Sequence, residues 1–287
     1  MTRSILRISG LASALLTAAT AGAQQQASAQ PTYANEMARE HAHDMAVASP
    51  ATRIAPRLGI AAGEMVTYGT VGGKTFKGYL AKPKAAKPGP AIVMVHEWWG
   101  LNDNIKSMAD RYAGEGYTVL AVDLFDGKVA TKPDDAMKLY QAGMADIPAG
   151  EANVAAAVAY LRKNGATSVG SVGYCFGGHW SLRTGLAGGK DVNAVVIYYG
   201  APITDPKQLA RLKAPVLGLF GGKDTGIPVD SVKAMNAAIT KQGGAMRLTV
   251  YDDAAHAFAN PTGTAYNEKA ANDAWAKSLA FFKAMLK

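Results

Sequence analysis

The chain has 287 residues, of which 49% are hydrophobic and 18% are charged, and its formal net charge is +8. This composition is typical of a globular protein and excludes an intrinsically disordered chain. Lys and Arg are scattered along the sequence without a basic stripe interleaved with aromatic residues, so we expect no nucleic-acid partner. The single cysteine, Cys175, excludes an internal disulfide.

Residues 1–23 have the pattern of an export signal. Arg3 and Arg7 precede an apolar run over residues 8–19, and Ala21-Gly22-Ala23 fits a cleavage site, with cleavage near residue 29 as the alternative. The run is shorter than the roughly 20 residues that a membrane-spanning helix needs. An uncleaved N-terminal anchor is the competing interpretation. We therefore expect a periplasmic or secreted protein without a membrane span in its mature chain.

Residues 24–62 are rich in Gln, Ala, Ser and Pro, which predicts a linker or loosely docked arm. A short solvated polar helix is expected over residues 34–46. His41 and His43 lie there beside two acidic residues. Side chains two positions apart on a helix point in different directions, so we expect no metal site from this pair.

Residues 63–287 alternate between strand and helix patterns, which predicts an α/β fold with one mainly parallel, doubly wound sheet. An N-terminal antiparallel hairpin is expected around Gly72-Gly73. The predicted strands are 64–69, 75–81, 91–95, 118–122, 169–174, 194–199, 215–220 and 247–251, and the predicted helices are 105–115, 133–144, 151–164, 178–186, 206–212, 229–242 and 265–286.

Cys175 stands in the sequence Gly173-Tyr174-Cys175-Phe176-Gly177, between an apolar strand and a helix. This context is typical of a nucleophile elbow, in which the central residue takes a strained backbone conformation. Glycines are expected at both flanks because side chains there would collide with the adjacent helix and strand. A small buried thiol packed under a helix is the competing interpretation.

An acid and a histidine follow the last two predicted strands. Asp224 comes after strand 215–220 and His256 after strand 247–251. The carboxyl ends of parallel strands meet at one edge of the sheet. The chain order nucleophile, acid, histidine is that of α/β-hydrolases, so Cys175, Asp224 and His256 are predicted to form a catalytic triad.

Four motifs together resemble the dienelactone hydrolase (carboxymethylenebutenolidase) family. They are Gly-Tyr-Cys-Phe-Gly-Gly, His-Glu-Trp-Trp-Gly, Gly-Gly-Lys-Asp and Ala-His-Ala-Phe, within residues 64–287. The resemblance implies an α/β-hydrolase fold without a cofactor, and hydrolysis of enol-lactones or esters through a thioester. It also implies that Glu97 contacts the resting thiol and gates it, although a structural carboxylate is the alternative. Asn260 stands where dienelactone-cleaving members carry an arginine, which argues against the dienelactone itself.

Further roles follow from this chemistry. The backbone N–H of Phe176, directly after the nucleophile, and that of Trp98 are expected to form the oxyanion hole. Trp99, Tyr174, Phe258 and Asn260 are candidates for the substrate pocket, with no metal ion. His96 and His179 are expected to be structural.

The sequence thus predicts a cysteine-dependent hydrolase of small carboxylic esters or lactones. A non-catalytic periplasmic binding protein on a hydrolase scaffold is one alternative, and a peptidase or acyltransferase using the same triad is another. A thiol redox sensor is disfavoured because the chain has no resolving cysteine. The sequence favours no particular oligomeric state.

Overall fold

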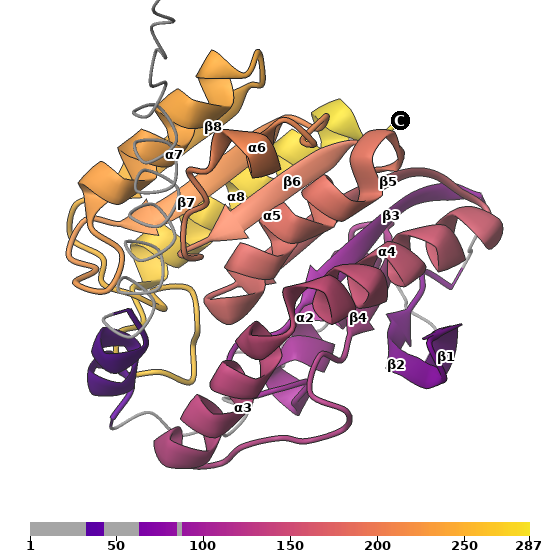
Figure 1. The fold of residues 1–287 in the computed structure, drawn as a ribbon, viewed down its shortest axis with the longest axis horizontal. Coiled ribbons are helices and arrows are strands. Elements are labelled where there is room, and N and C mark those ends of the chain that lie inside the picture. Colours follow the sequence, from indigo (N-terminus) through magenta and orange to yellow (C-terminus); the bar gives the residue numbers. More distant parts are fainter. Residues whose placement is uncertain (1–32, 43–62, 85–87) are drawn as a thin grey trace, which may run out of the picture.

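The computed structural model describes residues 33–42, 63–84 and 88–287 (Figure 1). Eight strands form one sheet in the order β1-β2-β4-β3-β5-β6-β7-β8. β1 and β2 pair antiparallel, as do β2 and β4, and every pair from β4 to β8 is parallel. The predicted fold class is confirmed. The predicted export signal and most of the arm lie outside the described residues.

The elements agree closely with the predicted alternation. The strands are β1 (Glu64–Val71), β2 (Lys74–Ala81), β3 (Gly89–Val95), β4 (Thr118–Val122), β5 (Ala166–Tyr174), β6 (Ala194–Tyr198), β7 (Val216–Gly221) and β8 (Met246–Tyr251). The helices are α2 (Asp103–Gly114), α3 (Pro133–Ala145), α4 (Ile147–Lys163), α5 (Phe176–Gly188), α6 (Pro206–Leu209), α7 (Val229–Lys241) and α8 (Glu268–Met285), with a 3₁₀ turn η2 (Gly189–Asp191).

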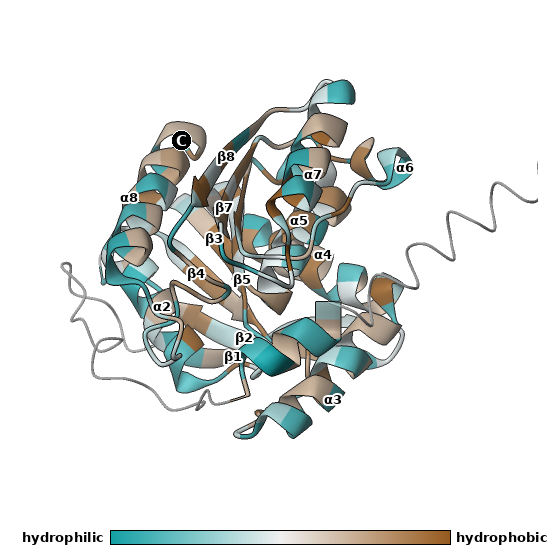
Figure 2. Cartoon of the chain, turned by 90° about the vertical axis from the view of Figure 1, so that its left-hand side faces the viewer, coloured by the Kyte–Doolittle hydropathy of each residue, from teal (hydrophilic) through white to brown (hydrophobic). Residues whose placement is uncertain are grey.

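The sheet lies between two layers of helices. In Figure 2, α2 and α8 cover one face, while α4, α5 and α7 cover the other. The central strands are buried on both sides, and residues 91–95 of β3 are fully inaccessible to solvent. This burial explains why their sequence is continuously apolar rather than alternating.

Local capping accounts for two helix boundaries that the sequence pattern misplaced. α4 begins at Ile147, four residues earlier than predicted, because the Asp146 side chain accepts a hydrogen bond from Ala149 N. α8 begins at Glu268, three residues later than predicted, because Asn267 caps it through Ala270 N. In both cases a side-chain oxygen satisfies a backbone N–H that has no partner inside the helix.

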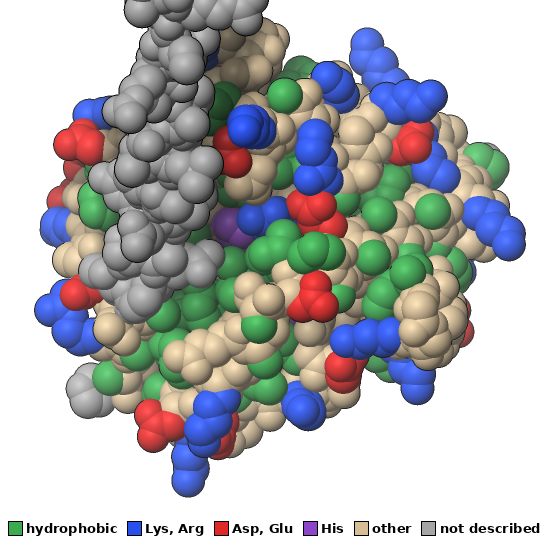
Figure 3. Space-filling view, in the orientation of Figure 1, with side chains coloured by type: hydrophobic (Ala, Val, Ile, Leu, Met, Phe, Trp, Pro, Cys, Tyr) green, Lys and Arg blue, Asp and Glu red, His purple; other side chains and the backbone are tan. Residues whose placement is uncertain are grey.

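Residues 33–42 form a short segment that is helical over 33–40 and drawn in indigo in Figure 1. We call residues 33–42 the covering segment. In the part of the chain that the structure describes, no helix has the length and apolarity needed to cross a bilayer. On the face seen in Figure 3, Lys and Arg side chains are interleaved with Asp and Glu around an apolar centre.

Candidate active site

Cys175 lies at the sharp turn between β5 and α5. Its backbone has φ 56° and ψ −119°, a conformation that L-residues rarely adopt. Backbone hydrogen bonds hold the turn: Cys175 N donates to Tyr198 O at 3.1 Å, and Gly178 N donates to Cys175 O at 2.9 Å. The strand–turn–helix therefore has the geometry of a nucleophile elbow, as the sequence predicted.

The two glycines that flank the turn allow a close backbone approach. A Cβ atom on Gly173 would lie 1.9 Å from Gly177 O, and one on Gly177 would lie 2.2 Å from Val95 O. Both neighbours are backbone atoms that cannot move aside cheaply. Any larger residue at either position would push α5 away from β3 and β5.

Asp224 and His256 meet at the same edge of the sheet. Asp224 follows β7, and its Oδ1 accepts hydrogen bonds from Gly226 N at 3.0 Å and Ile227 N at 2.8 Å. Its Oδ2 lies 2.7 Å from His256 Nδ1. The carboxylate is therefore fixed on one oxygen and orients the imidazole with the other.

Cys175 completes this cluster. Its Sγ lies within 4.8 Å of an imidazole nitrogen of His256. Among the described residues, His256 Nε2 has no hydrogen-bond partner of standard geometry, although His256 and Cys175 lie close enough to shift each other's pKa. The structure thus brings together three residues that are separated by 49 and 32 positions in the sequence.

The electrostatics of the pair favour thiolate and imidazolium. Burial opposes ionisation of Cys175, but His256 and then His41 outweigh it and lower the pKa of the thiol to about 6. Burial also opposes charge on His256, whereas Asp224 and then Cys175 raise its pKa well above its ordinary value. A proton shared by such a pair therefore resides on the imidazole at neutral pH.

Glu97 lies after β3, is only 3% exposed, and is paired with Asn260. Asn260 Nδ2 donates to Glu97 Oε2 at 2.8 Å. Asn260 Oδ1 in turn accepts hydrogen bonds from the backbone N and the hydroxyl of Thr262, at 2.9 and 2.7 Å. Glu97 is therefore held by Asn260, and the predicted contact between Glu97 and the thiol stays a prediction.

The predicted pocket residues separate into two groups. Tyr174 and Asn260 line a small cavity beside Glu97, together with Tyr199. An adjoining cavity of about 170 Å³ also includes Tyr174 in its lining. Phe258 instead packs in the core against the rings of three tyrosines, and Trp99 packs against Trp98 with ring centroids 5.0 Å apart. Neither cavity includes Cys175, Trp99 or Phe258 in its lining.

The two residues predicted for the oxyanion hole lie at the ends of neighbouring strands. Phe176 is the first residue of α5, so its N–H belongs to the four at a helix start that have no partner within the helix. Trp98 follows β3, which pairs with β5. Its ring is fully buried, and its centroid lies 5.1 Å from that of His41.

The covering segment closes the site, which the sequence analysis did not foresee. Met37 Sδ lies 3.3 Å from Cys175 Sγ, and the His41 ring centroid lies 5.3 Å from that of His256. Tyr33 packs edge-on against His256 at 6.3 Å. As a result Cys175 and His256 are each only 1% exposed.

The expectation of a solvated polar helix in this segment was wrong. Met37 is 1% exposed and His41 is 2% exposed. Tyr33, Met37 and His41 recur every four residues, which places them on one face of a helix. That spacing was a signal in the sequence that could have indicated a docked helix. His43 lies outside the described residues.

Polar bonds to the loop after β7 hold the covering segment in place. Glu40 Oε1 accepts hydrogen bonds from Thr225 N at 3.0 Å and from Thr225 Oγ1 at 2.6 Å. Thr225 Oγ1 also lies 3.3 Å from Glu36 Oε2. Because Thr225 directly follows Asp224, the segment is attached beside the acid of the cluster.

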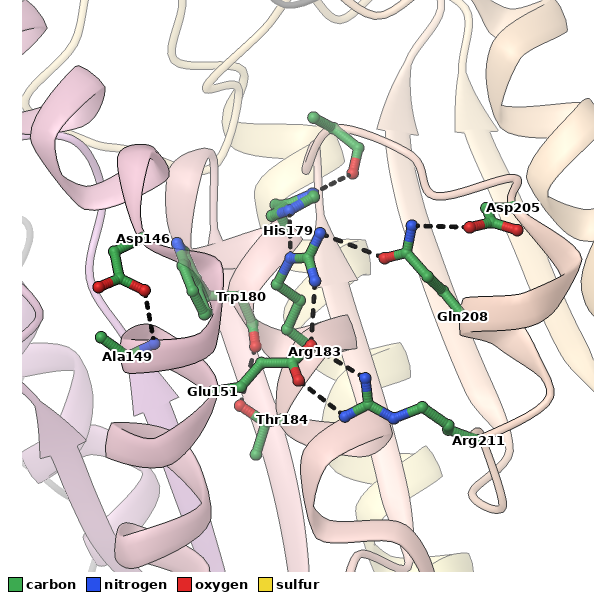
Figure 4. A network of polar contacts seen from close by, with 11 residues as sticks. Asp146, Ala149, Glu151, His179, Trp180, Arg183, Thr184, Asp205, Gln208 and Arg211 are labelled. Atoms are coloured by element: carbon green, nitrogen blue, oxygen red, sulfur yellow. Dashed lines mark hydrogen bonds and ion pairs between the residues drawn. The ribbon is translucent and has the colours of Figure 1, made fainter. Parts of the chain in front are cut away.

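His96 and His179 have structural surroundings. His96 Nδ1 lies 2.6 Å from Glu97 O, and its Nε2 accepts a hydrogen bond from Leu124 N at 3.1 Å. His179 Nδ1 lies 2.9 Å from Ala201 O, and its Nε2 accepts from Arg183 Nε at 2.7 Å (Figure 4). Both nitrogens of each ring are therefore engaged away from Cys175.

Comparison with a family model and with sequence relatives identifies the family of this chain. A model of the dienelactone hydrolase family matches residues 76–286. The Aquifex pyrophilus protein named usf is 34% identical, and the match covers 78% of this chain and 99% of that protein. A protein provisionally named carboxymethylenebutenolidase from Aquifex aeolicus is 32% identical, with 78% of this chain and all of that protein covered.

A solved structure supports the same relationship. The crystal structure of a provisionally named dienelactone hydrolase from Klebsiella pneumoniae superposes with a TM-score of 0.70 at 26% identity. The superposition covers 78% of this chain and 99% of that one.

Proposed function

Because the chain belongs to the dienelactone hydrolase family, we propose that this hydrolase cleaves carboxylic esters or lactones with Cys175 as nucleophile, His256 as acid and base, and Asp224 as the orienting carboxylate. The observation that carries the proposal is the convergence of the three groups. Asp224 Oδ2 lies 2.7 Å from His256 Nδ1, and Cys175 Sγ lies within 4.8 Å of the imidazole.

The reaction follows from these positions. The Cys175 thiolate attacks the carbonyl carbon, forming a C–S bond while the carbonyl electron pair moves to oxygen. As the intermediate collapses, the C–O bond to the leaving alcohol breaks, and His256 Nε2 donates the proton. His256 then takes a proton from water, which attacks the thioester. Collapse of this second intermediate releases the carboxylic acid and regenerates the thiolate.

The developing oxyanion would be stabilised by the backbone N–H groups of Phe176 and Trp98. The positive end of the α5 dipole faces the same position, because Cys175 immediately precedes this helix. Loss of one such donor typically raises the barrier by about 3 kcal/mol. This arrangement explains why a buried thiol at a helix start would be reactive rather than inert.

The pair formed by Glu97 and Asn260 limits the charge that the acyl group of a substrate can carry. The family's arginine would supply a cation for a substrate carboxylate, but here Asn260 bonds to the buried Glu97. A negatively charged acyl group would therefore meet a carboxylate at this place. We infer a preference for uncharged esters and lactones.

Turnover requires the covering segment to move. Met37 and His41 occupy the space directly over Cys175 and His256, so an ester carbonyl cannot reach the sulfur while they remain there. The bonds from Glu40 to Thr225 are on the molecular surface and exchange readily with water. We therefore assign the described arrangement to the closed state of the enzyme.

Hydrolysis of p-nitrophenyl acetate and of a panel of small lactones tests the proposal. Asp224→Asn is expected to lower kcat by about 10⁴-fold, as removal of the orienting carboxylate does in serine triads. Cys175→Ala and His256→Ala are expected to lower it at least as far. Lys132→Gln, an exposed position just before α3, is the control and should match the wild type.

The same assay also tests whether a closed covering segment, rather than a lack of catalytic chemistry, prevents hydrolysis. Glu40→Ala removes the acceptor of two bonds to Thr225 and should favour the open state. If both the wild type and Glu40→Ala fail to hydrolyse every ester and lactone, the non-catalytic binding protein becomes the better interpretation. Full activity in Cys175→Ala would exclude the thiol as nucleophile.

A further inference from the structure

The covering segment brings two additional metal-binding side chains to the catalytic pair. Ligand atoms of His41, Cys175 and His256 all lie within 4.8 Å of one another. Met37 Sδ lies 3.3 Å from Cys175 Sγ. All four side chains are at most 2% exposed. The closed state thus brings two imidazoles and one thioether to the Cys175 thiol.

The chemistry of these donors is selective. Thiolate and thioether sulfur favour soft ions such as Cu⁺, and thiolate and imidazole together favour Zn²⁺. None of these four side chains is a carboxylate, the ligand that Mg²⁺ and Ca²⁺ prefer. His256 also has the usual support of a metal-binding histidine, because its Nδ1 is bonded to Asp224 Oδ2 at 2.7 Å. That bond leaves Nε2 to face the thiol, and it fixes both the tautomer and the ring plane.

The spacing is compatible with a bound ion. Ligand atoms at about 2.0–2.3 Å from a tetrahedral metal stand roughly 3.3–3.8 Å from one another. The longest separation among the three atoms here is no more than 4.8 Å. Side-chain rotations that move these atoms by about an ångström would bring them to the distances of a bound metal. Burial of the cluster excludes the water that would otherwise compete for the ion.

We propose that the closed enzyme binds a thiophilic d¹⁰ ion, Cu⁺ or Zn²⁺, through Cys175 Sγ, His256 Nε2 and a ring nitrogen of His41, with Met37 Sδ as a fourth ligand for Cu⁺. Binding forms the metal–sulfur and metal–nitrogen bonds and releases to solvent the proton that the thiol and imidazole share. The oxidation state of the ion does not change. Since His41, and for Cu⁺ also Met37, come from the covering segment, the ion ties that segment to the catalytic residues and withholds the thiolate from substrate.

Ion affinity of the full chain provides the test, measured anaerobically by competition with chromophoric chelators for Cu⁺ and for Zn²⁺ separately. The wild type should bind one ion, and Cys175→Ser should not. Asp224→Asn, which loses the supporting carboxylate, should lower the affinity for each ion roughly 10–100-fold. His41→Ala, which loses a ligand, should lower both affinities by more than that. Asn35→Ala, at an exposed position on the covering segment, is the control and should match the wild type.

Met37→Leu distinguishes the two ions, because a thioether contributes to Cu⁺ binding and little to Zn²⁺ binding. The variant should lower the affinity for Cu⁺ at least about tenfold and leave the affinity for Zn²⁺ unchanged. Met65→Leu, at a position 54% exposed on β1, is the matched control. X-ray absorption of the wild type with Zn²⁺ bound should count one sulfur and two imidazole nitrogens around the ion. The His41→Ala variant should not reproduce this count.

Two results would overturn the proposal. One is a wild type that binds neither ion more tightly than Cys175→Ser does. The other is a His41→Ala variant with wild-type affinity and an unchanged nitrogen count, which would remove the covering segment from the site. Because binding is read without substrate, an enzyme inert toward esters that still binds the ion would count against the proposed hydrolysis and support this site.

Discussion

Backbone strain is concentrated at individual residues of the candidate site. Among the described residues, four other than glycine have positive φ, and three of them are Cys175, Tyr199 and Ala257. These three lie at the elbow, directly after β6 and directly after His256. Such conformations cost about 1–3 kcal/mol each and persist where the surrounding packing determines them. Here the strain positions the thiol and the imidazole at the ends of their strands.

Asn260 is the residue on which the environment of Glu97 depends. Its amide nitrogen donates to Glu97 Oε2, while its oxygen accepts from Thr262. A carboxylate at position 260 would keep the acceptor and lose the donor. The amide is therefore the side chain of this size that satisfies both neighbours.

Asn260→Asp should consequently destabilise the protein, by about 1–3 kcal/mol for the lost bond and more from repulsion between two buried carboxylates. Because protonation of either carboxyl removes that repulsion, the loss should be largest near neutral pH, should shrink as the pH falls towards about 4 and should be gone below it. Denaturant unfolding at several pH values measures it. Asn272→Asp, at an exposed position on α8, is the control, and equal effects of the two changes would refute this account.

At the scale of elements, α5 is fixed by a partly buried polar network that joins it to α4 and to the chain before β7. Arg183 Nη1 bonds to Glu151 at 3.0 Å, and Arg211 bonds to the same carboxylate at 2.7 Å (Figure 4). Arg183 Nε donates to His179 Nε2. The network holds α5 at its second turn, so that the helix start stays under Cys175.

His179 gives this network a measurable pH dependence. Burial, and then the neighbouring Arg183, lower the pKa of His179 to about 3. The unfolded chain takes up a proton at this residue below about pH 6.5, and the folded protein does so only near 3. Protonation therefore favours unfolding between these values, and the stability from neutral His179 is lost as the pH falls through them.

His179→Gln should flatten this part of the stability profile. The wild type is expected to lose about 1 kcal/mol more per pH unit than the variant as the pH falls from about 6 to 4. Urea unfolding across that range provides the free energies. Lys132→Gln, at an exposed position, is the control and should keep the wild-type slope. Identical slopes for the wild type and His179→Gln would contradict a buried, neutral His179.

At the scale of the whole molecule, a segment from the N-terminal arm closes a site built from the centre and the end of the sheet. The covering segment contacts Cys175 after β5, Thr225 after β7 and His256 after β8. It adds no strand to the sheet, and Tyr33, Ala34 and Met37 are its residues in the apolar core. We expect the segment to open without unfolding of the sheet.

Labelling of Cys175 with a disulfide reagent such as DTNB should report this opening. Glu40→Ala, which removes the acceptor for Thr225 N and Oγ1, should speed labelling several-fold, by about tenfold if roughly 1.4 kcal/mol of docking is lost. Glu64→Ala, at an exposed position on β1, is the matched control. If Cys175 is labelled equally slowly in the wild type and in Glu40→Ala, then Glu40 does not hold the segment closed.

The sequence by itself determined the fold class and the positions of the candidate residues. Alternation of apolar strands with amphipathic helices depends on local periodicity, which the printed residues carry directly. Gly173 and Gly177 marked the elbow because a close backbone approach leaves no substitute for glycine. Asp224 and His256 could be placed because parallel topology gathers strand ends at one edge.

Only the tertiary structure decided what surrounds those residues. The contact between Met37 and Cys175 joins positions 138 residues apart, and that between Asn260 and Glu97 joins positions 163 apart. Such contacts depend on how whole elements dock, and docking energy is shared among many small apolar and polar terms with no local signature. For this reason the sequence identified the thiol and its partners, while the closure above them and the donors it adds emerged from the folded chain.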